Sequence, residues 1–170
     1  MTPEFSHPVR LDHIGAGDTD IAISAGAEER AALARRFGLL SLDRLDARFR
    51  LRRDAAGVIA VGEVTGDAVQ PCIASAEPVP AAIRESVQLR FVPEGTAEGD
   101  EIELDDQSAD TVFYAGGAID LGEAAAETLA LALPPYPRSP HADTVLRDAG
   151  VLREEEAGPF SKLAALKDRL

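Results

Sequence analysis

Apolar side chains recur at every second position between residues 44 and 53, and this alternation constrains the fold more than any other feature. The apolar positions are Leu45, Ala47, Phe49 and Leu51. The positions between them hold Arg44, Asp46, Arg48, Arg50 and Arg52. Residues two apart share one face of a β-strand, so the segment predicts a strand with one buried face and one face in water. Such a strand needs a sheet that covers a core on one side.

Further strands are predicted on either side of this segment. A turn at residues 54–57 leads into a second strand over 58–69, and the two are expected to form an antiparallel hairpin. Residues 83–92 alternate again, with apolar side chains on one face and polar side chains on the other. Shorter strands are expected over 5–11 and 21–23.

Three helices are expected between and after these strands. Ser24 is placed to cap a helix near 26–37, and Asp120 is placed to cap a second helix near 121–133. Apolar residues along one stripe predict a C-terminal helix near 159–169. Strands and helices together predict an α+β fold on an antiparallel sheet, which either stays open or closes into a barrel.

The pattern divides the chain into one main domain and a tail. Residues 1–140 are expected to form a single α+β domain with an acidic loop at 93–111. Residues 141–170 are expected to form a polar linker and the amphipathic C-terminal helix. Residues 54–170 hold 22 acidic and 8 basic residues, so the acidity is concentrated in the second part of the chain.

Composition excludes several classes of protein. A formal charge of −13 rules out a generally basic protein that coats nucleic acid. One cysteine cannot form an internal disulfide or a CxxC zinc clamp, so neither a metal nor a cofactor is expected. No apolar run approaches the length of about 18 residues that spans a bilayer. The N-terminus lacks the features of a signal peptide, so we expect a cytoplasmic protein without a membrane partner.

The arginines of the alternating strands are the first candidate for a binding site. Arg44, Arg48, Arg50 and Arg52 recur along one strand face at a spacing that can follow a phosphate backbone, and Arg84 and Arg90 can extend the patch. The alternative is an ordinary wet face of a sheet, on which these arginines pair with Asp46 or Glu85. Both interpretations predict exposed arginines, and they differ in whether a carboxylate already holds each one.

The end of the chain is the second candidate, as a surface for a partner protein. Phe160, Leu163 and Leu166 lie on one stripe of the expected C-terminal helix, and Lys167 follows them. The stripe either packs on its own domain or docks into a partner. Elsewhere, Cys72 is expected to be a structural thiol, and the acidic run over 98–106 to be a solvated loop. No catalytic motif is present, so we do not expect an enzyme.

Several segments resemble the YceD family, bacterial proteins with plastid relatives that are described as large ribosomal RNA subunit accumulation proteins. The resemblance rests on the opening strand over 3–11, on Cys72 and the following Glu77-Pro78-Val79, on the helix Asp120-Leu121 to Leu133-Pro134, and on Pro159-Phe160 with Leu163 and Leu166-Lys167. Many members carry a second cysteine where this chain has Ser75. A zinc or redox role of such relatives therefore does not carry over.

The resemblance implies a non-enzymatic factor that supports synthesis, processing or accumulation of 23S rRNA. The implied partners are 23S rRNA or its precursor and a large-subunit ribosomal protein. Two alternatives stay open from the residues themselves. One is an acidic adaptor between proteins that makes no direct RNA contact. The other is a metal-dependent nuclease that uses the carboxylates of residues 100–110.

Overall fold

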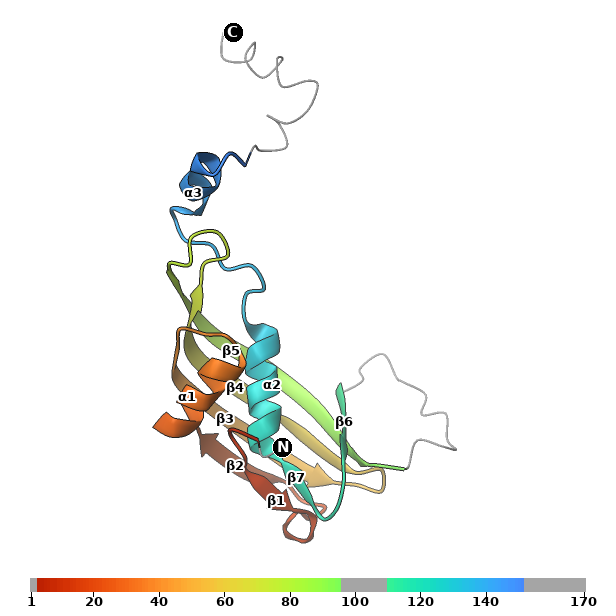
Figure 1. Ribbon diagram of the computed structural model, residues 1–170. Helices are drawn as coiled ribbons and strands as arrows, with labels where there is room; N and C mark the ends of the chain where they lie inside the picture. Colours follow the sequence, from red (N-terminus) through yellow and green to blue (C-terminus); the bar gives the residue numbers. More distant parts are fainter. Residues whose placement is uncertain (1–2, 96–109, 152–170) are drawn as a thin grey trace, which may run out of the picture. The chain divides into compact units, whose positions relative to one another are not determined.

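The computed structural model describes residues 3–95 and 110–151 of the chain (Figure 1). The elements are, in order, β1 (Pro8–Arg10), a short 3-10 turn (Leu11–His13), β2 (Thr19–Ser24), α1 (Ala27–Arg36), β3 (Ser41–Arg53), β4 (Val58–Pro71), β5 (Pro78–Pro93), β6 (Asp110–Tyr114), β7 (Ala118–Asp120), α2 (Leu121–Ala132) and α3 (Ala142–Asp148). They group into two compact units. The first unit comprises Met1–Gln70 and Pro80–Pro134, and the second comprises Pro71–Val79 and Pro135–Leu170.

The first unit is built on an open five-stranded sheet with the order β2-β3-β4-β5-β6. β3 pairs antiparallel with β2 and with β4, which confirms the predicted hairpin. β6 pairs parallel with β5, from Leu89 opposite Asp110 to Pro93 opposite Tyr114. β1 and β7 form a separate antiparallel pair. The α+β class is therefore confirmed, with a mixed sheet that is not closed into a barrel.

The core lies between the sheet and the helices α1 and α2, which cover the same face of the sheet in Figure 1. The alternation in β3 places Leu45, Phe49 and Leu51 on this face, where each is almost fully buried. Leu33 of α1 and Leu129 of α2 belong to the same apolar cluster. Burying a side chain of this size stabilises a fold by about 1.5–3 kcal/mol, so packing against β3 fixes both helices.

The starts of the two helices differ in how well the sequence predicted them. α1 begins after Gly26, whose N–H donates to Glu29 Oε2 over 2.6 Å. Ser24 does not cap α1, because its hydroxyl donates to Asp46 on the neighbouring strand β3. Asp120 caps α2 as predicted, and its Oδ1 accepts hydrogen bonds from the N–H groups of Gly122 and Glu123.

The second unit joins a tight turn to the segment that contains α3. The N–H of Cys72 donates to Glu77 O over 2.8 Å and closes the turn. The N–H of Ile73 donates to Pro137 O over 3.0 Å and so links the turn to the later segment. The expected C-terminal helix near 159–169 lies outside the described residues, as does most of the expected acidic loop at 93–111. The division at residue 140 stays a prediction.

None of the helices in the described part of the chain is both long enough and apolar enough to cross a membrane.

Candidate functional site

The outer face of the five-stranded sheet carries the arginines that the sequence analysis selected. Arg44, Arg48, Arg50 and Arg52 all lie on the face of β3 opposite the core, as the alternation requires. Arg84 of β5 reaches the same surface, because it lines one shallow hollow together with Arg44 and Arg48. The structure thus brings arginines from two strands into one cluster, which we call the outer arginine face.

Carboxylates from the neighbouring strands already hold three of these arginines. Ion pairs join Arg44 Nε to Asp67 Oδ2 (2.8 Å), Arg50 Nε to Asp20 Oδ1 (3.0 Å) and Arg84 Nη1 to Glu63 Oε2 (3.4 Å). The register explains the first two contacts, since Asp67 lies opposite Arg44 and Asp20 lies opposite Arg50. Opposite charges that face each other across a sheet partly neutralise one another.

Arg48 and Arg52 differ from their neighbours on β3. Both side chains are exposed, and neither forms an ion pair with any residue between 3 and 95 or between 110 and 151. Arg48 lies opposite Ala22 on one side and Glu63 on the other, but the Glu63 carboxylate contacts Arg84 instead. The outer arginine face therefore offers two guanidinium groups that need no carboxylate to be displaced before they bind an anion.

Arg90 has a structural role. Its Nη1 lies 3.1 Å from Asp54 Oδ2, in the turn that joins β3 to β4. Asp54 Oδ1 also accepts hydrogen bonds from the N–H groups of Ala56 and Gly57. Burial raises the pKa of Asp54, but these two N–H groups and the Arg90 guanidinium outweigh it and lower the pKa. Arg90 therefore fixes a turn.

A hydrogen-bonded cluster surrounds Cys72 in the second unit, and we call it the Cys72 cluster. Ser139 contributes two bonds to it: its N–H lies 3.2 Å from Cys72 Sγ, and its hydroxyl donates to Glu77 Oε2 over 2.5 Å. The Ser75 hydroxyl donates to the same Glu77 oxygen over 3.0 Å. His141 Nδ1 lies 3.3 Å from Glu77 Oε1. The cluster thus links the turn at residues 72–77 to the segment before α3.

The cluster favours the ionised forms of Cys72 and Glu77. The Ser75 hydroxyl and the N–H groups of Ser139 and Ala74 lower the pKa of the Cys72 thiol to about 6, although burial opposes them. Hydroxyl groups of Ser139 and Ser75 lower the pKa of Glu77. The thiol itself is buried, with 4% of the residue exposed. Hydrogen bonds therefore stabilise the thiolate of Cys72, while burial shields it from solvent.

No group of three or more histidine, cysteine or acidic side chains in the described part of the chain is arranged to hold a metal ion. Sequence reasoning named Cys72, Ser75 and Glu77 without placing them together, and it missed Ser139 and His141 as members of the same cluster. The two segments of the cluster lie more than 60 positions apart, so local sequence patterns do not predict that they meet. The only signals in the sequence are the Cys-x-x-Ser spacing and the later Ser-Pro-His run. The second predicted site, Phe160, Leu163, Leu166 and Lys167, lies outside the described residues.

The fold and these sites define a small α+β protein with an open mixed sheet, a polar outer face and a hydrogen-bonded turn around one cysteine. The family described as large ribosomal RNA subunit accumulation protein YceD matches residues 60–167, so the chain belongs to the YceD family. The match includes Arg84, Arg90 and the Cys72 cluster, whereas β3 precedes it. No curated protein matches the chain. No solved structure matches it either.

Proposed function

We propose that this protein is a non-enzymatic factor of large-subunit ribosome biogenesis that supports the accumulation of 23S rRNA. The observation that carries the proposal is membership of the YceD family, whose description names large ribosomal RNA subunit accumulation. The protein would act in the cytoplasm, by binding 23S rRNA or its precursor, a large-subunit ribosomal protein, or both. It would do so without chemistry of its own.

The outer arginine face is the surface we propose for RNA. Arginine binds phosphate oxygens in a fork geometry, and Arg48 and Arg52, which have no ion-pair partner among the described residues, can do so without giving up a described ion pair. Arg44, Arg50 and Arg84 would have to exchange a carboxylate for a phosphate, which returns little free energy. With a net charge of −13, RNA contact would stay local to this face.

A second candidate function is that of an acidic adaptor that contacts only proteins. It is favoured by the charge, since residues 54–170 carry 22 acidic and 8 basic residues. A binding assay with purified components separates the two. Binding of the pure protein to precursor 23S rRNA that carries no ribosomal protein would support direct RNA contact. Binding that requires a ribosomal protein would support the adaptor.

The experiment that tests the proposed role compares the ratio of 23S to 16S rRNA in cells with and without this protein. We expect 23S rRNA to fall selectively when the protein is removed, and to recover when the unaltered gene is returned. An unchanged ratio with normal precursor processing would contradict a role in large-subunit biogenesis. Return of an Arg48→Gln/Arg52→Gln variant then asks whether the outer arginine face is needed for this role.

A further inference from the structure

Part of one strand edge in the first unit has no described strand beside it. β5 lies between β4 and β6 in the sheet, but β6 pairs only with residues 89–93 of β5. Residues 80–88 therefore have a strand on their β4 side and, within the described parts of the chain, none on the other side. An edge of this kind presents backbone N–H and C=O groups to any chain that can lie along it.

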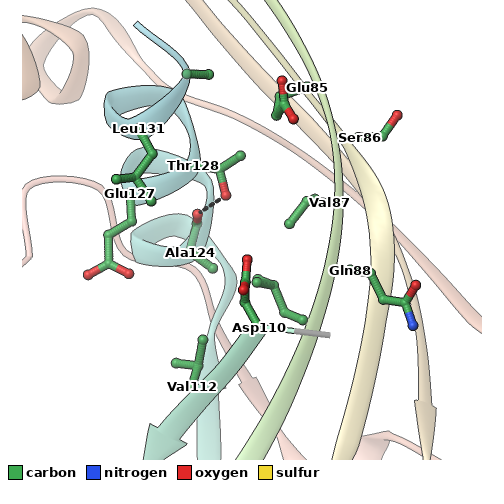
Figure 2. Close-up of a pocket in the computed structure, with 12 residues that line it drawn as sticks. Glu85, Ser86, Val87, Gln88, Asp110, Val112, Ala124, Glu127, Thr128 and Leu131 are labelled. Carbon is green, nitrogen blue, oxygen red and sulfur yellow. Dashed lines mark hydrogen bonds between the residues drawn. The ribbon is translucent and has the colours of Figure 1, made fainter. Parts of the chain in front are cut away.

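A groove of about 470 Å³ runs along this edge, between β5 and α2 (Figure 2). In Figure 2, Val87 points toward α2, while Ser86 and Gln88 point to the other side of the strand. The remaining apolar lining comes from Leu89, Val112, Ala124, Leu131 and Ala132. Leu131 is 88% exposed although it lies on the helix that covers the core, so the groove has an unburied apolar wall.

Acidic side chains surround the groove. Glu85 of β5, Asp110 of β6 and Glu127 of α2 all line it, and no lysine or arginine does. None of these three carboxylates forms an ion pair with a described residue, whereas Glu63 and Asp67 on the outer face are paired with arginines. The sequence has no basic residue between Arg90 and Arg138, so every β6 and α2 residue of the groove comes from a stretch without lysine or arginine.

We propose that this groove, the β5 edge groove, binds an extended basic segment of another protein, which adds to the sheet as a strand beside residues 80–88. Main-chain hydrogen bonds to the open edge would supply affinity. Lysine or arginine side chains of the partner would lie near Glu85, Asp110 and Glu127, and apolar side chains between them would contact Val87 and Leu131.

The charge decides between this partner and other occupants. A nucleic acid would bring phosphates against three carboxylates, which repel them. A second copy of this chain, paired edge to edge, would bring two acidic rims together. Residues 96–109 of the same chain are themselves acidic and meet the same repulsion. The groove would bind such a basic segment whether or not the protein acts on 23S rRNA.

The test uses the full-length protein and a synthetic probe, the peptide Lys-Thr-Val-Thr-Lys-Thr-Val-Thr-Lys. This sequence places lysine and valine on one face of a strand and threonine on the other. We expect it to bind, and the same peptide with glutamate in place of lysine not to bind. Two further versions of the lysine peptide, methylated on opposite sets of alternate backbone amides, then test the mode of binding. One should bind and the other should not, because a strand presents alternate amides to its two sides.

Matched protein variants locate the site. Glu85→Gln/Glu127→Gln should weaken binding of the lysine peptide on the order of fivefold, since exposed charge pairs contribute modestly. Glu28→Gln/Asp43→Asn removes the same charge from exposed positions outside the groove and should leave the affinity unchanged. Equal weakening in both variants would overturn the proposal, as would equal binding of the two methylated peptides.

Hydrogen exchange supplies a separate readout that does not depend on the variants. Addition of the lysine peptide should slow exchange of backbone amides within residues 80–88 and leave β2 unaffected. Full protection of the open-edge amides before the peptide is added would overturn the proposal. If dilution of the protein removed that protection, the edge would be occupied by a second copy of the chain. If the protection survived dilution, the edge would be occupied by residues 96–109 of the same chain.

Discussion

Asp67 Oδ2 lies 2.8 Å from Arg44 Nε across the β3–β4 pair, so an arginine that the sequence marks as a phosphate ligand is already held by a carboxylate. The same applies to Arg50 and Asp20. Arg48 and Arg52 lie on the same face of the same strand without such a partner among the described residues. The register of β2, β3 and β4 therefore determines which arginines of this face are free to bind a phosphate and which are already held by a carboxylate.

We predict that Arg48→Gln/Arg52→Gln weakens binding to precursor 23S rRNA more than Arg44→Gln/Arg50→Gln does. Each phosphate contact contributes a slope of roughly −0.7 to −0.9 to the dependence of log affinity on log salt concentration, so the first variant should reduce the slope by about 1.5. The measurement is a salt titration of binding with purified protein and RNA. Equal effects of the two variants would contradict the ranking.

The Cys72 thiol should titrate near pH 6 in the folded protein. Hydrogen bonds led by the Ser75 hydroxyl lower its pKa to about 6 from an unfolded value near 8.5. The thiolate therefore stabilises the fold fully above the unfolded pKa, and this contribution is lost as the pH falls through about 6. Since the chain has one cysteine, thiolate absorbance in the ultraviolet reports this group alone. Ser75→Ala should move the midpoint upward, whereas Ser86→Ala, on β5, should not.

Asp120→Ala should destabilise the first unit by about 2 kcal/mol, measured by urea unfolding. Asp120 Oδ1 accepts the N–H of His7 over 2.8 Å as well as the N–H groups that start α2, so one side chain caps the helix and ties it to the N-terminal segment. Loss of an N-cap alone costs about 1 kcal/mol, and the bond from His7 adds to it. Ser6→Ala removes only the bond to Oδ2 and should cost less.

Asp120 should also make stability depend on pH in the acid range. Burial raises its pKa, but the bonds from Ser6, His7, Glu123 and Gly122 outweigh burial and lower it. The stabilisation by its carboxylate is present above the usual aspartate pKa of about 4 and is lost as the pH falls through the lower folded value. Asp120→Asn should therefore flatten the stability profile below about pH 4 relative to the unaltered protein.

Gly62→Ala should be severely destabilising, because β3 and β4 approach closely at this position. An added Cβ would lie 2.1 Å from the Arg48 carbonyl oxygen and 3.0 Å from a ring carbon of Phe49. Backbone atoms cannot move aside cheaply, so we expect a loss of at least about 2 kcal/mol in the free energy of unfolding. Gly17→Ala is the control, since an added Cβ there meets nothing within 4 Å. Similar stability of the two variants would contradict the close approach.

Local patterns accounted for most of the elements. The period of two over residues 44–53 predicted β3 and its buried face, and Asp120 predicted the start of α2. Ser24 misled because its local position suits a helix cap, while the paired strand β3 offers its hydroxyl the carboxylate of Asp46. A contact that only strand pairing creates cannot be read from nearby sequence.

The sequence by itself determined which side chains face the core and which face water, because strand and helix periodicity is a local property of the backbone. Tertiary structure decided which charges meet. Cross-strand register pairs Arg44 with Asp67 but leaves Arg48 free of described partners, and it sets β6 beside residues 89–93 of β5, so that no described strand lies on that side of residues 80–88. Ser139 reaches Glu77 from 62 positions away for the same reason. Such pairings depend on how distant segments align, and packing of the whole core sets that alignment.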